Sequence, residues 1–254
     1  YKDTPSERIF DDFEDLIFEG NGLGRNILGT PESVDGLSRN DILEFKSRTY
    51  TAERIKIAIT GPYGGDRITA VLGEYFGGWS LTKNQWSAEN SATTAPRRIV
   101  SPEAQFQDHF MTGWRIPGIH SSDRRALLLL NNVLGGPAMN SRLGLNIREK
   151  HGIAYNIESY MNLYSDVGML GIYLGCDPLQ TKKAEQLVYK EVEKFISQPL
   201  GTLQLSKAKN QFIGQMALAE ENGLNSAIGA ARALLHFGKV STFDFVASQI
   251  RDLT

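Results

Sequence analysis

The stretch S-R-L-G-L-N-I-R-E-K-H-G-I-A-Y, which covers residues 141–155, decides how this chain is expected to fold. Its first part predicts an amphipathic helix, in which the apolar residues Leu143, Leu145 and Ile147 stand among arginines and a lysine. Gly152 is expected to end this helix, because glycine readily adopts the left-handed conformation required just after a helix C-terminus. The stretch therefore predicts a helix that stops abruptly at a glycine turn.

An extended run follows the turn at once, from Ala154 to Tyr160, and predicts a strand. Arg148 thus closes the helix while Tyr155 opens the strand, so two hydrogen-bond donors flank one tight turn. Donors held by rigid elements can bind a carbonyl oxygen. On spacing alone, a purely structural interpretation is the simpler one, because an arginine in a last helical turn complements the helix dipole and tyrosine is common in strands.

A longer pattern surrounds these two residues. It reads N-S-R-L-x-x-x-I-R-E-K-x-G-I-A-Y, preceded by L-L-N-N-V-L-G-G and followed by Y-S-D-V-G-M-L-G-I-Y. This run resembles the second domain of pitrilysin- and insulinase-type zinc peptidases, in particular the bacterial homologues of the mitochondrial processing peptidase. In that family an Arg and a Tyr at these places bind the substrate backbone beside the zinc. The resemblance implies this role for Arg148 and Tyr155, which match in type and in their seven-residue separation.

The composition narrows the class of protein. The 254 residues can form one large domain or two small ones, and 41% apolar and 22% charged residues are typical of a soluble globular protein. A net charge of −2 without a basic stripe indicates no nucleic acid partner. No apolar run approaches the roughly 18 residues that span a bilayer. Cys176 is the only cysteine, so no internal disulfide is possible, and it is expected in the core.

Both ends of the sequence predict a piece of a longer chain. Tyr1 is not a methionine and leads directly into a helical pattern, and Arg251–Thr254 stops inside another one. The lack of a disulfide is compatible with the cytoplasm and with the periplasm, so either compartment is expected.

The composition also changes along the chain in a way that predicts two domains. Residues 1–79 carry helical patterns and one alternating segment, residues 55–60, which predicts a half-buried strand. Residues 80–103 are rich in Ser, Thr, Asn, Ala and Pro without periodicity and are expected to be a linker. Residues 104–254 then predict a strand, a helix, the stretch quoted above, a hairpin and four further helices.

The resemblance gives these segments a place in a fold. It implies that residues 1–79 are the C-terminal half of a first peptidase domain. Residues 104–254 would be the second peptidase-like domain without its last strand and helix. The implied fold class is α+β, with two tandem pitrilysin-type α/β domains, each an antiparallel sheet covered by helices and both incomplete here.

The residues needed to hold zinc are not present as a pattern. A zinc hydrolase needs about three protein ligands, an open coordination position and a carboxylate near the metal-bound water. Relatives supply these with H-x-x-E-H on a helix and a distal Glu. None of the four histidines here lies four residues from another (His109, His120, His151 and His236). The expectation is therefore zinc in the intact parent, no metal ligand in this chain, and no activity of the chain alone.

The resulting functional prediction is a fragment of a zinc-dependent metalloendopeptidase that cleaves unfolded peptides. This part would supply the Arg148 and Tyr155 side of the chamber. Its expected partners are the unfolded peptide, the missing N-terminal half of the parent, and a second copy or related subunit in a homodimer or heterodimer. The alternative is a non-catalytic, peptide-binding subunit of a heteromeric peptidase of this type, and a purely structural scaffold is a third interpretation. The residues encoded upstream of Tyr1 would discriminate among them.

Overall fold

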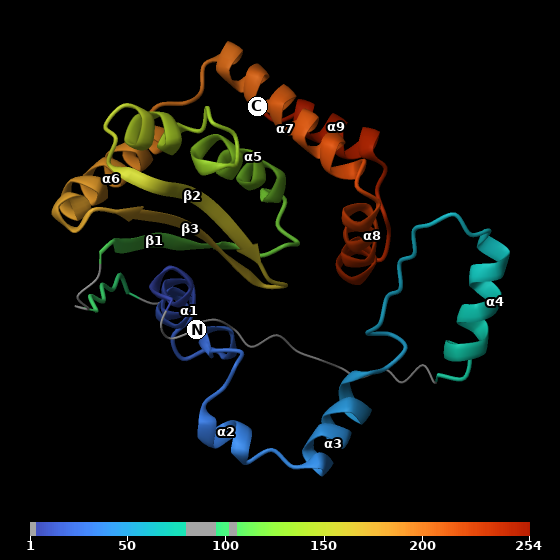
Figure 1. The fold of residues 1–254 in the computed structure, drawn as a ribbon. Coiled ribbons are helices and arrows are strands. Elements are labelled where there is room, and N and C mark those ends of the chain that lie inside the picture. The colour runs from blue at the N-terminus through green and yellow to red at the C-terminus, as the bar shows by residue number, and fades with distance from the viewer. Residues whose placement is uncertain (1–3, 80–94, 102–105) are drawn as a thin grey trace. The chain divides into compact units, whose positions relative to one another are not determined.

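Strand β3 (Val167–Cys176) is buried along nearly its whole length, as expected of a strand with neighbours on both edges and layers on both faces. It pairs antiparallel with β1 (Asp108–Pro117) and with β2 (Ala154–Leu163), so the sheet order is β1-β3-β2. The predicted hairpin is therefore confirmed. Together with the helices, this sheet makes the α+β architecture that the resemblance implied (Figure 1).

The computed structural model of the chain describes residues 4–79, 95–101 and 106–254. Its α-helices are α1 (Pro5–Ile17), α2 (Pro31–Asp35), α3 (Arg39–Thr49), α4 (Gly65–Phe76), α5 (Arg124–Gly135), α6 (Thr181–Ser197), α7 (Thr202–Glu220), α8 (Gly223–Phe237) and α9 (Phe243–Arg251). Three short helical turns of other types are η1 (Gly22–Gly24), η2 (Gly144–Glu149) and η3 (Pro178–Gln180). Among the described residues, no helix is both long enough and apolar enough to cross a membrane.

The chain divides into two units. The first unit comprises Tyr1–Ile27, Ala88–Phe212 and Gln249–Thr254, and the second unit comprises Leu28–Ser87 and Ile213–Ser248. Most of the predicted linker, at residues 80–94 and 102–103, lies outside the described residues. The domain boundaries expected from the sequence therefore stay a prediction.

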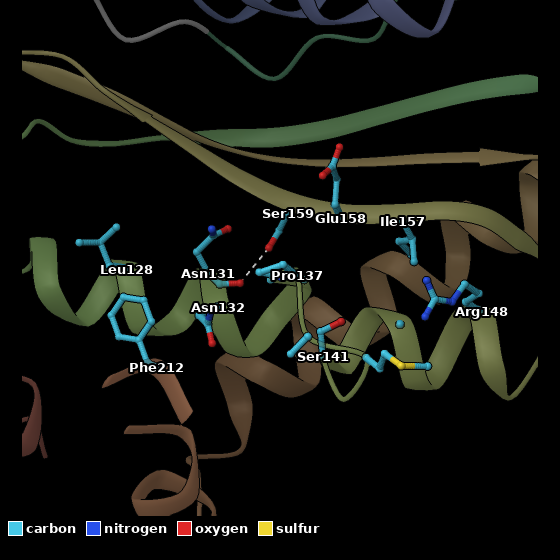
Figure 2. A pocket seen from close by; sticks show the side chains of 15 residues that line it. Leu128, Asn131, Asn132, Pro137, Ser141, Arg148, Ile157, Glu158, Ser159 and Phe212 are labelled. Atoms are coloured by element: carbon cyan, nitrogen blue, oxygen red, sulfur yellow. Dashed lines mark hydrogen bonds between the residues drawn. The ribbon is translucent and has the colours of Figure 1, made fainter. Parts of the chain in front are cut away.

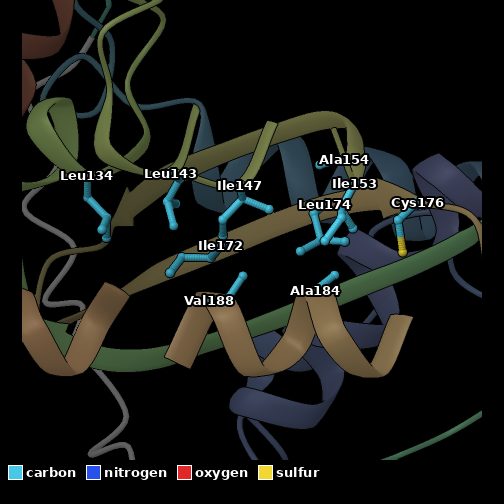
Figure 3. Close-up of a cluster of buried hydrophobic side chains, with 10 residues drawn as sticks. All are labelled: Leu134, Leu143, Ile147, Ile153, Ala154, Ile172, Leu174, Cys176, Ala184 and Val188. Carbon is cyan, nitrogen blue, oxygen red and sulfur yellow. The ribbon is translucent and has the colours of Figure 1, made fainter. Parts of the chain in front are cut away.

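One face of the sheet in the first unit carries the larger hydrophobic core (Figure 3). Its buried members come from α5, η2 with the residues around it, β2, β3 and α6: Leu134, Leu143, Ile147, Ile153, Ala154, Ile172, Leu174, Cys176, Ala184 and Val188. Cys176 is fully buried and free, as expected. Burial of each large aliphatic side chain contributes about 1.5–3 kcal/mol. This core fixes the helix that carries Arg148 against the sheet.

Helix α1 covers the opposite face of the same sheet (Figure 1). Phe13 and Phe18 are buried there beside Met169 of β3. The Nε of Arg115 donates to the carbonyl oxygen of Ile17 at 2.7 Å, which satisfies one carbonyl at the end of α1. The N-terminal helix is thus an integral layer of the first unit.

The alternating segment of the second unit does not form the predicted strand. Residues 55–60 belong to no helix or strand, and Ile57 and Ile59 are 40% and 49% exposed. A strand needs a neighbour to accept and donate its backbone hydrogen bonds. Within the described residues, the only paired strands are the three of the first unit. Alternation alone was therefore not sufficient, and the strand prediction was wrong.

Candidate functional site

The helix that carries Arg148 is π-helical. It begins at Ser141, whose carbonyl accepts from the amide of Leu145 at 2.9 Å, and it widens so that the amide of Lys150 donates to Leu145 at 3.0 Å. That five-residue bond defines a π-turn, which is rare and frequently marks a functional site. Leu145 is 46% exposed, so it does not share the buried face of its apolar neighbours as the sequence suggested. A residue two positions away on a helix points to the other side.

Gly152 ends this helix as predicted. Its φ is 61°, and its amide donates to the carbonyl of Arg148 at 2.9 Å. This bond is typical of a left-handed helix ending, in which the residue after the cap satisfies a carbonyl of the last turn, and the amide of Ile153 donates to the carbonyl of Ile147 at 3.5 Å. Ile147 before the turn and Ile153 after it are buried in the core. Arg148 is therefore held on both sides by buried neighbours.

Tyr155 is the extra residue of a β-bulge. Ala154 lies opposite Cys176 and Asn156 lies opposite Gly175, so the register shifts by one at Tyr155. Bulges are over-represented next to active sites, where they re-aim a side chain. Tyr155 is 63% exposed although Ala154 beside it is buried. The Tyr155 side chain is thus accessible to a ligand, while its neighbours Ala154 and Asn156 pair with β3.

Arg148 presents most of its donors outward. Its side chain is 36% exposed, and its Nε donates to Glu149 Oε1 at 3.0 Å. A guanidinium carries five N–H donors. Within the part of the chain that the structure describes, no other hydrogen bond of this side chain is found, which leaves its two terminal nitrogens available to a ligand.

A cavity of about 350 Å³ opens beside Arg148 (Figure 2). Ser141, Gly144 and Arg148 line it from one face of the helix. The opposite walls come from α5, the Gly-Gly-Pro-Ala loop after it, β2 and the first-unit part of α7: Leu128, Asn131, Asn132, Gly135, Gly136, Pro137, Ala138, Met139, Ile157, Glu158, Ser159 and Phe212. Tyr155 is not among the lining residues. Of the two predicted site residues, only Arg148 faces this cavity.

The floor of the cavity depends on a close helix–strand contact. A Cβ atom at Gly135 would lie 2.4 Å from the backbone nitrogen of Ser159, so only glycine allows α5 to approach β2 this closely. The hydroxyl of Ser159 donates to the carbonyl of Asn131 at 3.0 Å and fastens the contact. The sequence did not predict this cavity. The signal for it in the sequence is the Gly135–Pro137 run, because glycine permits the close approach of two backbones.

A buried carboxylate fixes the Arg148 helix to α6. Glu191 is 5% exposed and accepts hydrogen bonds from Asn146 Nδ2 at 3.0 Å and from Lys194 Nζ at 2.7 Å. Arg142 also lies over the Phe195 ring of α6, 4.8 Å from its centroid. A buried carboxylate with these partners is costly to disturb. Sequence reasoning missed Glu191 because a lone Glu on a helix is usually solvated.

The histidines do not assemble a metal site. Among the described residues, no group of three or more His, Cys, Asp or Glu side chains could hold a metal ion. His109 lies with Nδ1 2.9 Å from the Tyr173 hydroxyl, and burial lowers its pKa. Zinc therefore does not fit the residues that the structure describes.

Known proteins share both sequence and fold with this chain. Residues 36–212 match the family model of the peptidase M16 inactive domain. The chain is 28% identical, over 99% of its length, to an uncharacterized zinc protease of Mycobacterium leprae, of which it covers 57%. It is 25% identical, over 92% of its length, to a probable mitochondrial-processing peptidase subunit beta of Schizosaccharomyces pombe, of which it covers 53%.

The same fold occurs in a crystal structure of a peptidase M16 inactive domain from Pseudomonas fluorescens. The two structures agree with a TM-score of 0.84 at 18% identity, over 100% of this chain and 61% of that one. The chain thus spans little more than half the length of the relatives it matches.

Proposed function

The chain belongs to the family of the peptidase M16 inactive domain, and on that premise we propose that it forms the peptide-binding side of a zinc-dependent endopeptidase. Relatives named zinc proteases support a role within a peptidase. The observation that supports the peptide-binding role is the placement of Arg148 and Tyr155. Each sits on an irregular element, a π-turn and a β-bulge, on either side of a glycine turn pinned by buried residues.

The proposed role of both side chains is to donate hydrogen bonds to the carbonyl oxygen of the peptide bond that is cleaved. As that carbon becomes tetrahedral, negative charge develops on the oxygen, and donors already in place stabilise it without rearrangement. Arg148 has its terminal nitrogens to offer, and Tyr155 has an accessible hydroxyl. Arg148 also binds the neutral carbonyl before reaction, because a guanidinium donates strongly in both states.

Zinc enters this proposal as part of the parent protein and not of this chain. We place its ligands in the missing N-terminal half of the parent, because the described residues offer no ligand set. No step through the metal is assigned to residues of this chain. The chain alone is expected to cleave no peptide.

Two further features of the parent belong to the same proposal. Residues 1–79 and 104–254 would be parts of two tandem domains of the peptidase type. The parent would also close its chamber by pairing with a second copy or a related subunit. The Schizosaccharomyces pombe relative, which is named a subunit, supports such pairing.

A non-catalytic peptide-binding subunit is the second candidate. The matched family model describes an inactive domain. Such a domain fits a non-catalytic subunit as well as it fits the inactive half of an active enzyme. An H-x-x-E-H motif in the parent sequence upstream of Tyr1 would decide for the catalytic protein.

The test of the proposal is kinetic. In the intact parent in its active assembly, Tyr155→Phe is expected to lower kcat roughly 10²- to 10³-fold with little change in KM, because the lost donor acts on the developing oxyanion. Arg148→Ala is expected to raise KM as well, since it also holds the ground-state carbonyl. Turnover and thermal midpoint are measured on the same preparations.

Tyr189→Phe serves as the control, because Tyr189 is an exposed tyrosine on α6 whose hydroxyl lies 3.2 Å from Thr112 Oγ1. It should leave kcat unchanged. Wild-type turnover of both site variants, with a lowered thermal midpoint, would show that Arg148 and Tyr155 are structural and that the proposal is wrong.

A further inference from the structure

The carbonyl binding proposed above uses Arg148 but gives no role to the cavity that Arg148 lines. Its volume of about 350 Å³ is at the small end of the range for ligand sites. It is suited to one or two side chains and not to a large cofactor. Because Arg148 lines it, a peptide held by Arg148 has a neighbouring side chain within reach of the cavity.

The charge presented to the cavity has one sign. Of its lining residues only Arg148 and Glu158 are charged. Figure 2 shows Glu158 pointing away from the cavity, on the opposite face of β2 from Ile157 and Ser159. The register agrees, since Glu158 lies opposite Tyr173, whose ring contacts Phe10 of α1 on the other face. Among the described residues that line the cavity, Arg148 is therefore the only one whose charged side chain is directed into it.

The remaining walls suit a short polar side chain with an aliphatic stem. Ser141 and Asn132 supply neutral polar groups, while Ile157 and Phe212 supply apolar surface. Glu149, which occupies the Nε of Arg148, is not a lining residue. The two terminal nitrogens of Arg148 can thus serve two acceptors, a peptide carbonyl and a carboxylate.

We propose that this cavity is a side-chain subsite for an acidic residue of the bound peptide, adjacent in sequence to the carbonyl that Arg148 and Tyr155 hold. The carboxylate pairs with the Arg148 guanidinium, and the methylene groups rest on Ile157 and Phe212. The inference rests on the proposed function, and it adds a sequence preference that carbonyl binding alone does not produce.

The experiment measures binding of capped pentapeptides to the 254-residue chain by NMR. The probes share alanine flanks and differ only in a central Glu, Gln or Lys. The Glu peptide is expected to bind roughly 10-fold more tightly than the Gln peptide. A hydrogen bond between two charged groups is stronger than one to a neutral amide, and the gain corresponds to about a tenfold change in affinity. The Lys peptide is expected to bind least. Shifts should concentrate at Arg148, the side-chain amide of Asn132, and Ser159.

Introducing a negative charge at the rim of the cavity, with a neutral substitution as its control, gives a matched pair of variants. Met139 lines the cavity and is 77% exposed, so the fold tolerates substitution there. Met139→Glu should abolish the preference for the Glu peptide, and Met139→Gln should preserve it. Equal affinity for all three peptides, with binding still weakened by Arg148→Ala, would overturn the subsite and leave the proposed function standing. Binding of no peptide at millimolar concentration would overturn both.

Discussion

Both units of this chain contain helices with apolar residues, yet among the described residues the large buried apolar side chains lie in the first unit, and the second buries only Ala247. In the first unit, Leu143, Ile147 and Ile172 are fully buried against the sheet. In the second unit, Ile42 and Phe45 of α3 are 60% and 54% exposed, and the described residues of this unit contribute to neither hydrophobic core. The difference is the sheet, because a helix can hide an apolar stripe only against another layer.

The comparison separates local structure from stability. The helices of both units begin and end at signals in their own sequence, such as the capping box of Thr30 and Ser33 at α2. Cooperative stability comes from packing an apolar face, which short helices need in water. The first unit has that packing on both faces of its sheet. The candidate site, with Arg148 and Tyr155, lies on this more firmly packed unit.

Hydrogen exchange should show the largest contrast between the units. Amides in the middle of β3, such as Ile172, are expected to exchange only through global unfolding of the first unit, whereas residues 55–60 pair with no strand and should exchange almost freely. Native-state exchange followed by NMR should find rates that differ by roughly 10³-fold or more. Comparable protection at both places would show that residues 55–60 are as firmly held as the middle of β3.

Helical glycines offer a sharper test at single residues. Gly135→Ala is expected to destabilise the first unit by about 1–3 kcal/mol, because the new Cβ would meet Ser159 of β2 at 2.4 Å. Gly229→Ala in α8 has nothing within 4 Å and should stabilise that helix by about 0.5–1 kcal/mol. Urea denaturation followed by far-UV circular dichroism measures both. Destabilisation by both variants would show that the second unit is packed more tightly than its exposed residues indicate.

The smallest expected effect is electrostatic and lies between α1 and the sheet. Burial raises the pKa of Glu14 above its usual 4.5, although a hydrogen bond from Asn162 Nδ2 at 2.8 Å opposes the shift. A carboxyl that binds its proton more tightly in the folded state adds stability below its unfolded pKa, and this stability is lost as pH rises through the folded pKa.

Glu14→Gln cannot titrate and keeps an oxygen for Asn162 to donate to. The thermal midpoint of the variant should therefore rise relative to wild type by about 1–2 °C between about pH 4 and about pH 7, because the carboxyl remains partly solvated. Glu44→Gln on the exposed face of α3 is the control and should show no such trend. If the difference in thermal midpoint between Glu14→Gln and wild type did not change with pH, α1 would not bury this carboxyl.

The local features of the site followed from the sequence. The helix ends at Gly152 because glycine itself readily adopts the left-handed conformation found there. The hairpin of β2 and β3 follows from the periodicity of the two strands and the short turn between them. Arg148 and Tyr155 were identified by resemblance to a motif that is contiguous in sequence. Their role stays a prediction until it is measured.

Features that depend on distant contacts could be decided only by the tertiary structure. The bulge that exposes Tyr155 exists because Ala154 and Asn156 pair with consecutive residues of β3. The cavity exists because Gly135 meets Ser159, and the anchor of the Arg148 helix exists because Asn146 meets Glu191. Conversely, residues 55–60 alternate like a strand but have no strand to pair with among the described residues. Periodicity and turn residues determine what a segment can form, whereas burial and hydrogen bonding between distant segments determine whether it forms and what it presents.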